Sequence, residues 1–207
     1  MIKCIIFDCD GTLVDSEVLF NRALSHKLAE KGIHISASTL VDRFRGVKFI
    51  DVLATIEQES KTVLNDDFVT SYRDLVTELF EQELQACEGV AETLASLNTA
   101  MCVATNGPLA KMQQALRVTA LHHYFNEALF SAYEIEAWKP SPDLFLHASK
   151  MMGFEHDECL VVEDSLVGIE AALAAKMKAV LFDPHSIHSD ISGVIRITEF
   201  SKISKLL

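Results

Sequence analysis

The chain has 207 residues, enough for one sizeable domain or for one domain that carries a smaller insertion. Apolar residues make up 49% of the sequence and charged residues 23%, which is typical of globular proteins and argues against disorder or a fibrous class. The formal net charge of −12 disfavours nucleic acid and anionic membrane surfaces as main partners, because both would repel the protein.

The first predicted element is a short apolar strand over residues 4–7, which begins almost at the amino terminus. No basic segment, long apolar stretch and small-residue cleavage site precede it, so no secretory signal is expected. The five cysteines form no Cys-x-x-Cys pair, which favours a reducing compartment. The other apolar runs are far shorter than the roughly 20 residues that cross a bilayer. We therefore expect a cytoplasmic protein without membrane contacts.

Residues 15–86 offer no comparable strand and show helical periodicity instead, with apolar residues three and four positions apart. This pattern predicts a helical domain over 15–86, inserted into a core formed by 1–14 and 87–207. An insertion at the carboxyl end of a strand lies over the crevice where α/β sheets bind ligands, so we expect a cap. The alternative is a helical subdomain without a role in binding.

One segment of this insertion is basic in an otherwise acidic protein, since Arg43, Arg45 and Lys48 occur within residues 41–50. Arg45 and Lys48 are candidates for binding the carboxylate or hydroxyls of a sugar. The alternative is a solvated basic turn.

After the insertion, short apolar runs alternate with helical stretches. The predicted strands are 101–105, 159–162 and 179–182, with a weaker one at 127–130, and the predicted helices are 109–116, 142–151 and 166–176. This alternation predicts an α/β fold with a Rossmann-like parallel sheet core and an inserted helical cap domain.

Two carboxylates, Asp8 and Asp10, directly follow the first strand, and Gly11 supplies a turn. Their spacing of two places both side chains on one side if the extended conformation persists. They would then repel each other unless a cation lay between them or one held a proton, as a hard-metal site with a separate acid requires. By itself Asp-x-Asp-Gly is also a common plain turn.

Three further polar segments follow strands or rigid loops. Thr105 and Asn106 open a helix after a strand and are suited to bind a phosphate, or simply to cap the helix. Lys139 lies among prolines that stiffen its loop, which suits a lysine that neutralises phosphate. Glu163 and Asp164 either cap the next helix or complete the cation site. Capping alone does not explain all these segments together.

The ordered set resembles the haloacid-dehalogenase-like hydrolase superfamily over essentially the whole chain. The segments that carry the resemblance are Asp8-Cys9-Asp10-Gly11-Thr12, Thr105-Asn106-Gly107, Lys139-Pro140 and Glu163-Asp164-Ser165. The insertion looks like the small helical cap of this family. A narrower likeness, to bacterial phosphatases of phosphosugar acids, is carried by residues 44–48, 101–108 and 138–140.

The resemblance implies a phosphatase that acts on a small-molecule phosphate ester, a sugar phosphate or a phosphosugar acid. Asp8 would attack phosphorus and form an aspartyl-phosphate, and Asp10 would act as acid and then as base. Mg²⁺ would bind to the Asp8 carboxylate, the Asp10 main-chain carbonyl and Asp164. Glu163 would lie next to these ligands without binding the ion directly.

The resemblance also implies that three residues contact the substrate phosphoryl group. Thr105 and the main chain of Asn106 would donate hydrogen bonds to its oxygens, and Lys139 would offset its charge. The sequence does not settle the oligomeric state and is compatible with a monomer.

Several alternatives remain. A phosphosugar mutase of the β-phosphoglucomutase type shares core and cap, but it carries a histidine where this chain has Phe20. Dehalogenases lack the second aspartate, here Asp10. A receiver module of a response regulator also places acidic residues, Thr and Lys at strand ends, but receivers are shorter and lack the helical insertion.

Overall fold

The computed structural model describes residues 1–44, 47, 49–189 and 191–207. These residues form two compact units, one from Met1–Asp15 and Gln85–Leu207 and the other from Ser16–Leu84. That the second unit serves as a cap stays a prediction.

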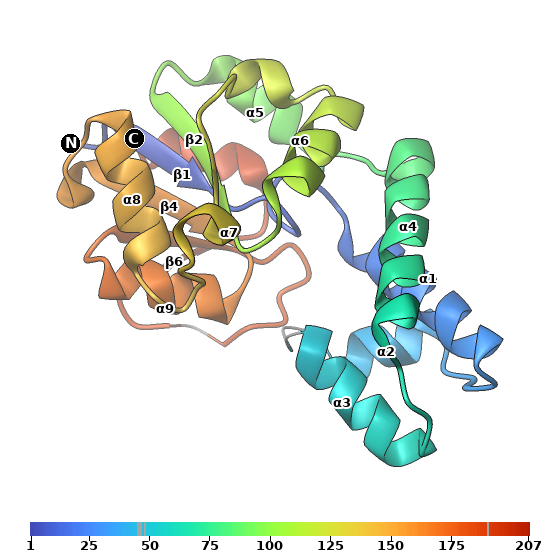
Figure 1. Cartoon of the computed structure of the whole chain (residues 1–207). Helices are drawn as coiled ribbons and strands as arrows, with labels where there is room; N and C mark the ends of the chain where they lie inside the picture. Colours follow the sequence, from blue (N-terminus) through green and yellow to red (C-terminus); the bar gives the residue numbers. More distant parts are fainter. Residues whose placement is uncertain (45–46, 48, 190) are drawn as a thin grey trace. The chain divides into compact units, whose positions relative to one another are not determined.

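A parallel sheet forms the centre of the larger unit (Figure 1). Within the described residues it has six strands, in the order β3-β2-β1-β4-β5-β6, and every neighbouring pair is parallel. The predicted α/β fold with a parallel sheet core is therefore confirmed. The strands are β1 Cys4–Phe7, β2 Ala100–Thr105, β3 Leu129–Ser131, β4 Cys159–Glu163, β5 Lys178–Phe182 and β6 Ile195–Ile197.

The strand order reverses at β1. Strands β2 and β3 lie on one side of β1, and the next strand along the chain, β4, lies on its other side. Phe7 pairs with Val103 of β2 and with Val162 of β4, so these three strands end at one edge of the sheet. Ligands of open α/β sheets bind at such a reversal, beyond the carboxyl ends of the strands.

Helices cover the sheet and bury its central strands. All residues of β1 and β4 are buried, which explains why residues 4–7 and 159–162 are continuous apolar runs in the sequence. The helices and 3₁₀ turns of this unit are α5 Val90–Ser96, α6 Leu109–Val118, α7 Ala132–Ile135, α8 Asp143–Met152, α9 Leu166–Ala174, η1 His122–Tyr124, η2 His156–Glu158 and η3 Phe200–Lys205.

The two faces of the sheet have different cores. Helix α8 contacts β1 and β2, and α9 contacts β4 and β5, over a cluster of small and aliphatic side chains that includes Ile6 and Ala172. Phe7 belongs to an aromatic group, because its ring stacks on that of Phe200 at 5.8 Å and meets that of Phe125 edge-on at 6.0 Å. The sheet is thus fixed by close packing on both sides of β1.

The smaller unit is helical. Its described residues form α1 Glu17–Glu30, α2 Ala37–Phe44, α3 Phe49–Ser60 and α4 Asp66–Glu83, and α1 contacts both α2 and α4. Asn65 caps α4 by accepting a hydrogen bond from the main-chain nitrogen of Phe68 at 3.1 Å. The ring of Phe20 lies 5.4 Å from that of Phe80, and both help to hold α1 against α4.

The chain leaves and re-enters the larger unit through two segments that pair with each other. Val14 forms an antiparallel bridge with Ala86, and the main-chain nitrogen of Asp15 donates to the carbonyl oxygen of Gln85 at 3.0 Å. Cys87 donates in turn to Leu13 at 3.0 Å. The segments before and after the helical insertion therefore lie next to each other and are joined by hydrogen bonds.

Some elements differ from the sequence-based expectation. Strand β3 begins at Leu129 rather than at 127, and β6, α5 and α7 were not predicted. Strand β6 has three residues, and Ile195 and Arg196 are exposed, so no apolar run marks it. Helices α5 and α7 are too short to show a clear helical period. In the described part of the chain, no helix is both long and apolar enough to cross a membrane.

Candidate active site

A buried lysine links two carboxylates at the end of β1. Asp8 follows β1, and its main-chain nitrogen donates to the carbonyl oxygen of Val162 at 2.9 Å, which extends the pairing with β4. The Nζ of Lys139 lies 2.5 Å from Oδ1 of Asp8 and 2.6 Å from Oε1 of Glu163. The side chains of Lys139, Asp8 and Glu163 are only 3%, 10% and 1% exposed. The two carboxylates therefore fix the position of the ammonium group.

The loop that carries Lys139 is held by a side-chain amide. Asn106 accepts from the Lys139 main-chain nitrogen through Oδ1 at 2.8 Å and donates through Nδ2 to its carbonyl oxygen at 3.3 Å. The ring of Phe145 lies 4.9 Å from Nζ, close enough for a cation–π interaction. The side chain of Asn106 thus positions Lys139, and the role expected for its main chain stays a prediction.

Glu163 is oriented by the residues that begin α9. Its Oε2 accepts hydrogen bonds from the main-chain nitrogen of Ser165 at 3.0 Å and from the Ser165 hydroxyl at 2.7 Å. The Ser165 oxygen accepts in turn from the main-chain nitrogen of Gly168 at 3.0 Å. A Cβ at Gly168 would lie 1.9 Å from Cδ of Glu163, so α9 needs a glycine there. Both Glu163 oxygens thus serve to hold Lys139 and the helix end.

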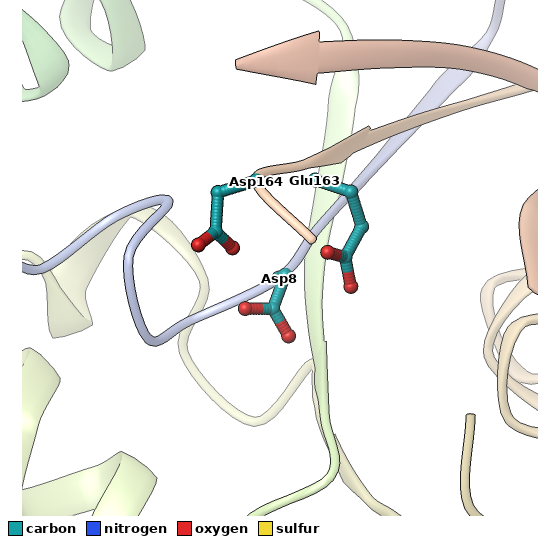
Figure 2. Close-up of side chains that lie close together, drawn as sticks. All are labelled: Asp8, Glu163 and Asp164. Atoms are coloured by element: carbon teal, nitrogen blue, oxygen red, sulfur yellow. The ribbon is translucent and has the colours of Figure 1, made fainter. Parts of the chain in front are cut away.

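Asp164 lies beside Asp8 and Glu163 (Figure 2). Its side chain stays partly accessible. The Thr12 hydroxyl donates to its Oδ1 at 3.1 Å. Gly11, with a φ of 81°, passes so close that a Cβ on it would lie 2.2 Å from Oδ2 of Asp164. Thr12 and Gly11 therefore fix the position of Asp164, and no local pattern in the sequence indicates the contact of Thr12.

The site holds an excess of negative charge. Oxygens of Asp8, Glu163 and Asp164 lie within 4.8 Å of one another (Figure 2). Burial, together with the neighbouring carboxylate of Glu163, raises the pKa of Asp8 to about 7 against the opposing effect of Lys139. Burial and the carboxylates of Glu163 and Asp8 raise the pKa of Asp164 well above its usual value. Both carboxylates would be more stable as anions beside an added cation.

Lys139 stays charged in this surrounding. Burial alone would lower its pKa, but the carboxylates of Asp8 and Glu163 outweigh burial and raise its pKa above the ordinary value. The group therefore offers a permanent positive charge to an anionic ligand.

Asp10 is placed differently from Asp8. The chain bends at Cys9, and the carboxylate of Asp10 pairs with Lys111 on α6, with 2.6 Å between Oδ2 and Nζ. Because each aspartate has its own lysine, the two carboxylates do not need to share one cation. Lys111 was not singled out in the sequence.

Thr105 ends β2 and is buried, and its hydroxyl oxygen accepts from the main-chain nitrogen of Gly107 at 3.1 Å. This bond leaves the hydroxyl hydrogen available to a ligand. Arg45 and Lys48 lie outside the described residues.

The chain is similar to known proteins over most of its length. The family model of haloacid dehalogenase-like hydrolases matches residues 5–182. The chain is 37% identical to the 6-phosphogluconate phosphatase of Escherichia coli strain K12, over 99% of this chain and 93% of that protein.

Two solved structures share the fold. A haloacid dehalogenase-like protein of Agrobacterium tumefaciens has a TM-score of 0.85 at 30% identity, over 100% of this chain and 97% of that one. A hydrolase of Deinococcus radiodurans, solved with bound phosphate and sodium, has a TM-score of 0.78 at 28% identity, over 99% and 93% of the chains. The resemblance expected from the motifs is confirmed.

We expect Gly168→Ala to destabilise the protein by about 1–3 kcal/mol, because the new Cβ and the Glu163 carboxylate cannot occupy the same space. Urea unfolding would measure this change in the free energy of unfolding. The control is Glu170→Ala at an exposed position of the same helix, where we expect little change. Wild-type stability in Gly168→Ala would contradict the close contact.

Proposed function

Because the chain belongs to the haloacid dehalogenase-like hydrolase family, we propose that it is a Mg²⁺-dependent phosphatase that works through an aspartyl-phosphate on Asp8. The observation that carries the proposal is the contact of Lys139 with Asp8 inside a buried acidic group. A carboxylate in such a place is poised beside a positive charge that can also attract a phosphate ester.

The proposed reaction has two displacements. An oxygen of Asp8 attacks phosphorus while the bond from phosphorus to the ester oxygen breaks, and Asp10 gives a proton to the departing alkoxide. The oxygen of a water molecule then attacks phosphorus, Asp10 accepts a proton from that water, and the bond between phosphorus and Asp8 breaks. Inorganic phosphate leaves, and both aspartates return to their starting states.

Three groups would stabilise the charge of the phosphoryl group during these steps. Lys139 is fixed and charged, the Thr105 hydroxyl has its hydrogen available, and the Asn106 main chain offers a further donor. Positioned donors of this kind contribute about 3 kcal/mol each in comparable oxyanion sites.

The carboxylates fit a magnesium ion. They are hard oxygen ligands, they lie close together, and burial makes their negative charge costly without a cation. Asp8, Asp164 and the main-chain carbonyl of Asp10 would hold the ion, while Glu163 remains engaged with Lys139. When bound, the ion supplies positive charge that offsets the charge of the phosphate ester.

The names of the relatives support a substrate class. We propose a sugar phosphate or a phosphosugar acid, since the chain is 37% identical to an enzyme named 6-phosphogluconate phosphatase. A role of Arg45 and Lys48 in binding the sugar part rests on the sequence and stays a prediction.

The function is tested by phosphate release from a panel that contains 6-phosphogluconate, sugar phosphates and p-nitrophenyl phosphate. We expect release with Mg²⁺ and loss of release with excess chelator, and we expect Asp8→Asn to abolish turnover of every substrate. Asp157→Asn, at an exposed position, is the matched control. Phosphate release by Asp8→Asn would refute the role of Asp8, and rearrangement of a sugar phosphate without phosphate release would favour a mutase.

The binding of Mg²⁺ should depend on pH. Because burial raises the pKa of Asp8 to about 7, the group is largely protonated below that pH, and an incoming ion must displace the proton. We therefore expect Mg²⁺ to bind more tightly as the pH rises through about 7 and to release protons on binding. Calorimetry at about pH 6 and about pH 8, in buffers of different ionisation enthalpy, measures both effects. An affinity that is the same at both pH values would contradict the prediction.

A further inference from the structure

Lys111 occupies an unfavourable place on its helix. Helix α6 runs over Leu109–Val118, so Lys111 lies in its first turn, where the helix dipole disfavours a positive charge. The cost of such a placement is about 0.3–1 kcal/mol. Arg117, in the last turn, has the favourable position instead. The helix itself therefore gives no reason for a lysine at position 111.

The ion pair of Lys111 does not explain the residue through stability either. Nζ of Lys111 lies 2.6 Å from Oδ2 of Asp10, and the two side chains are 25% and 26% exposed. Ion pairs with this access to water contribute only about 0–1 kcal/mol. A lysine that is poorly placed in its helix and little rewarded by its ion pair is a candidate for function.

Gly107 shows that polar groups converge at this point. A Cβ built on Gly107 would lie 3.5 Å from the Thr105 hydroxyl oxygen, 3.6 Å from Nζ of Lys111 and 3.8 Å from Oδ2 of Asp10. A longer side chain at position 107 would enter the space among these three groups. All of them belong to the larger unit. Asp10 follows β1, Thr105 ends β2 and Lys111 lies on the helix after β2, so they meet at the sheet edge that also carries Asp8.

We propose that Lys111 is a positioning residue, which holds the Asp10 carboxylate so that Asp10 can give its proton to the departing alkoxide. This inference rests on the proposed phosphatase function. The two lysines then have separate tasks: Lys139 is buried between Asp8 and Glu163 beside the phosphoryl group, and Lys111 restricts the rotation of Asp10. Contact with Oδ2 limits the directions in which the rest of that carboxylate can point.

The test compares two leaving groups. A sugar alkoxide needs a proton in order to leave, whereas p-nitrophenolate leaves without one, so only the first depends on a well-placed Asp10. The value of kcat/KM covers the steps up to the departure of the alcohol. For Lys111→Met we expect kcat/KM to fall about 100-fold for the best sugar phosphate of the wild type and less than about 10-fold for p-nitrophenyl phosphate.

Two other variants complete the test. Lys111→Arg keeps the charge and should restore much of the activity on the sugar phosphate, because an arginine can still pair with Asp10. Lys150→Met removes an exposed lysine from α8 and should leave both substrates unaffected. If Lys111→Met does not fold, Lys111→Gln serves for the same comparison.

Equal losses on both substrates would overturn the inference, because they would indicate a merely structural role, and so would the absence of any loss. A wild-type protein that releases phosphate from no ester would instead refute the proposed function, and this would be seen before any variant is measured.

Discussion

The rest of the site depends on one interaction, the contact of the buried Lys139 ammonium group with the carboxylates of Asp8 and Glu163. A charge withdrawn from water costs several kcal/mol unless its partners are well placed, and loss of one partner of a buried pair costs about 3–5 kcal/mol. The surrounding chain supplies that placement. Asn106 holds the main chain of Lys139, and Gly168 leaves room for the Glu163 carboxylate.

The strand order brings these partners together. Because β1 lies between β2 and β4, the residues that follow these three strands meet at one edge although they are far apart in the chain. Asp8 follows β1, Asp164 follows β4, and Thr105 ends β2. The helices that begin there, α6 and α9, carry residues that support the site. The sheet and the helices therefore position the site residues together.

Much of the fold could be predicted from sequence, because buried parallel strands appear as short apolar runs and the polar residues behind them mark one sheet edge. Asp8, Glu163 and Asp164 were found in this way, and the structure brings them together. The contact of Lys111 with Asp10 could not be predicted from the sequence, because 101 residues separate the two and no local pattern indicates it. Likewise, the need for glycine at position 168 arises only from the path of the Glu163 side chain.

The paired segments at Val14 and Ala86 give the protein a modular construction. The insertion leaves and re-enters the larger unit through adjacent residues that are hydrogen-bonded to each other. For the larger unit, the insertion is therefore a loop whose two ends are held together. The entropy of closing a loop changes by only about 0.6 kcal/mol when its length doubles. Evolution can therefore exchange or lengthen the inserted helices at this junction with little effect on the stability of the sheet.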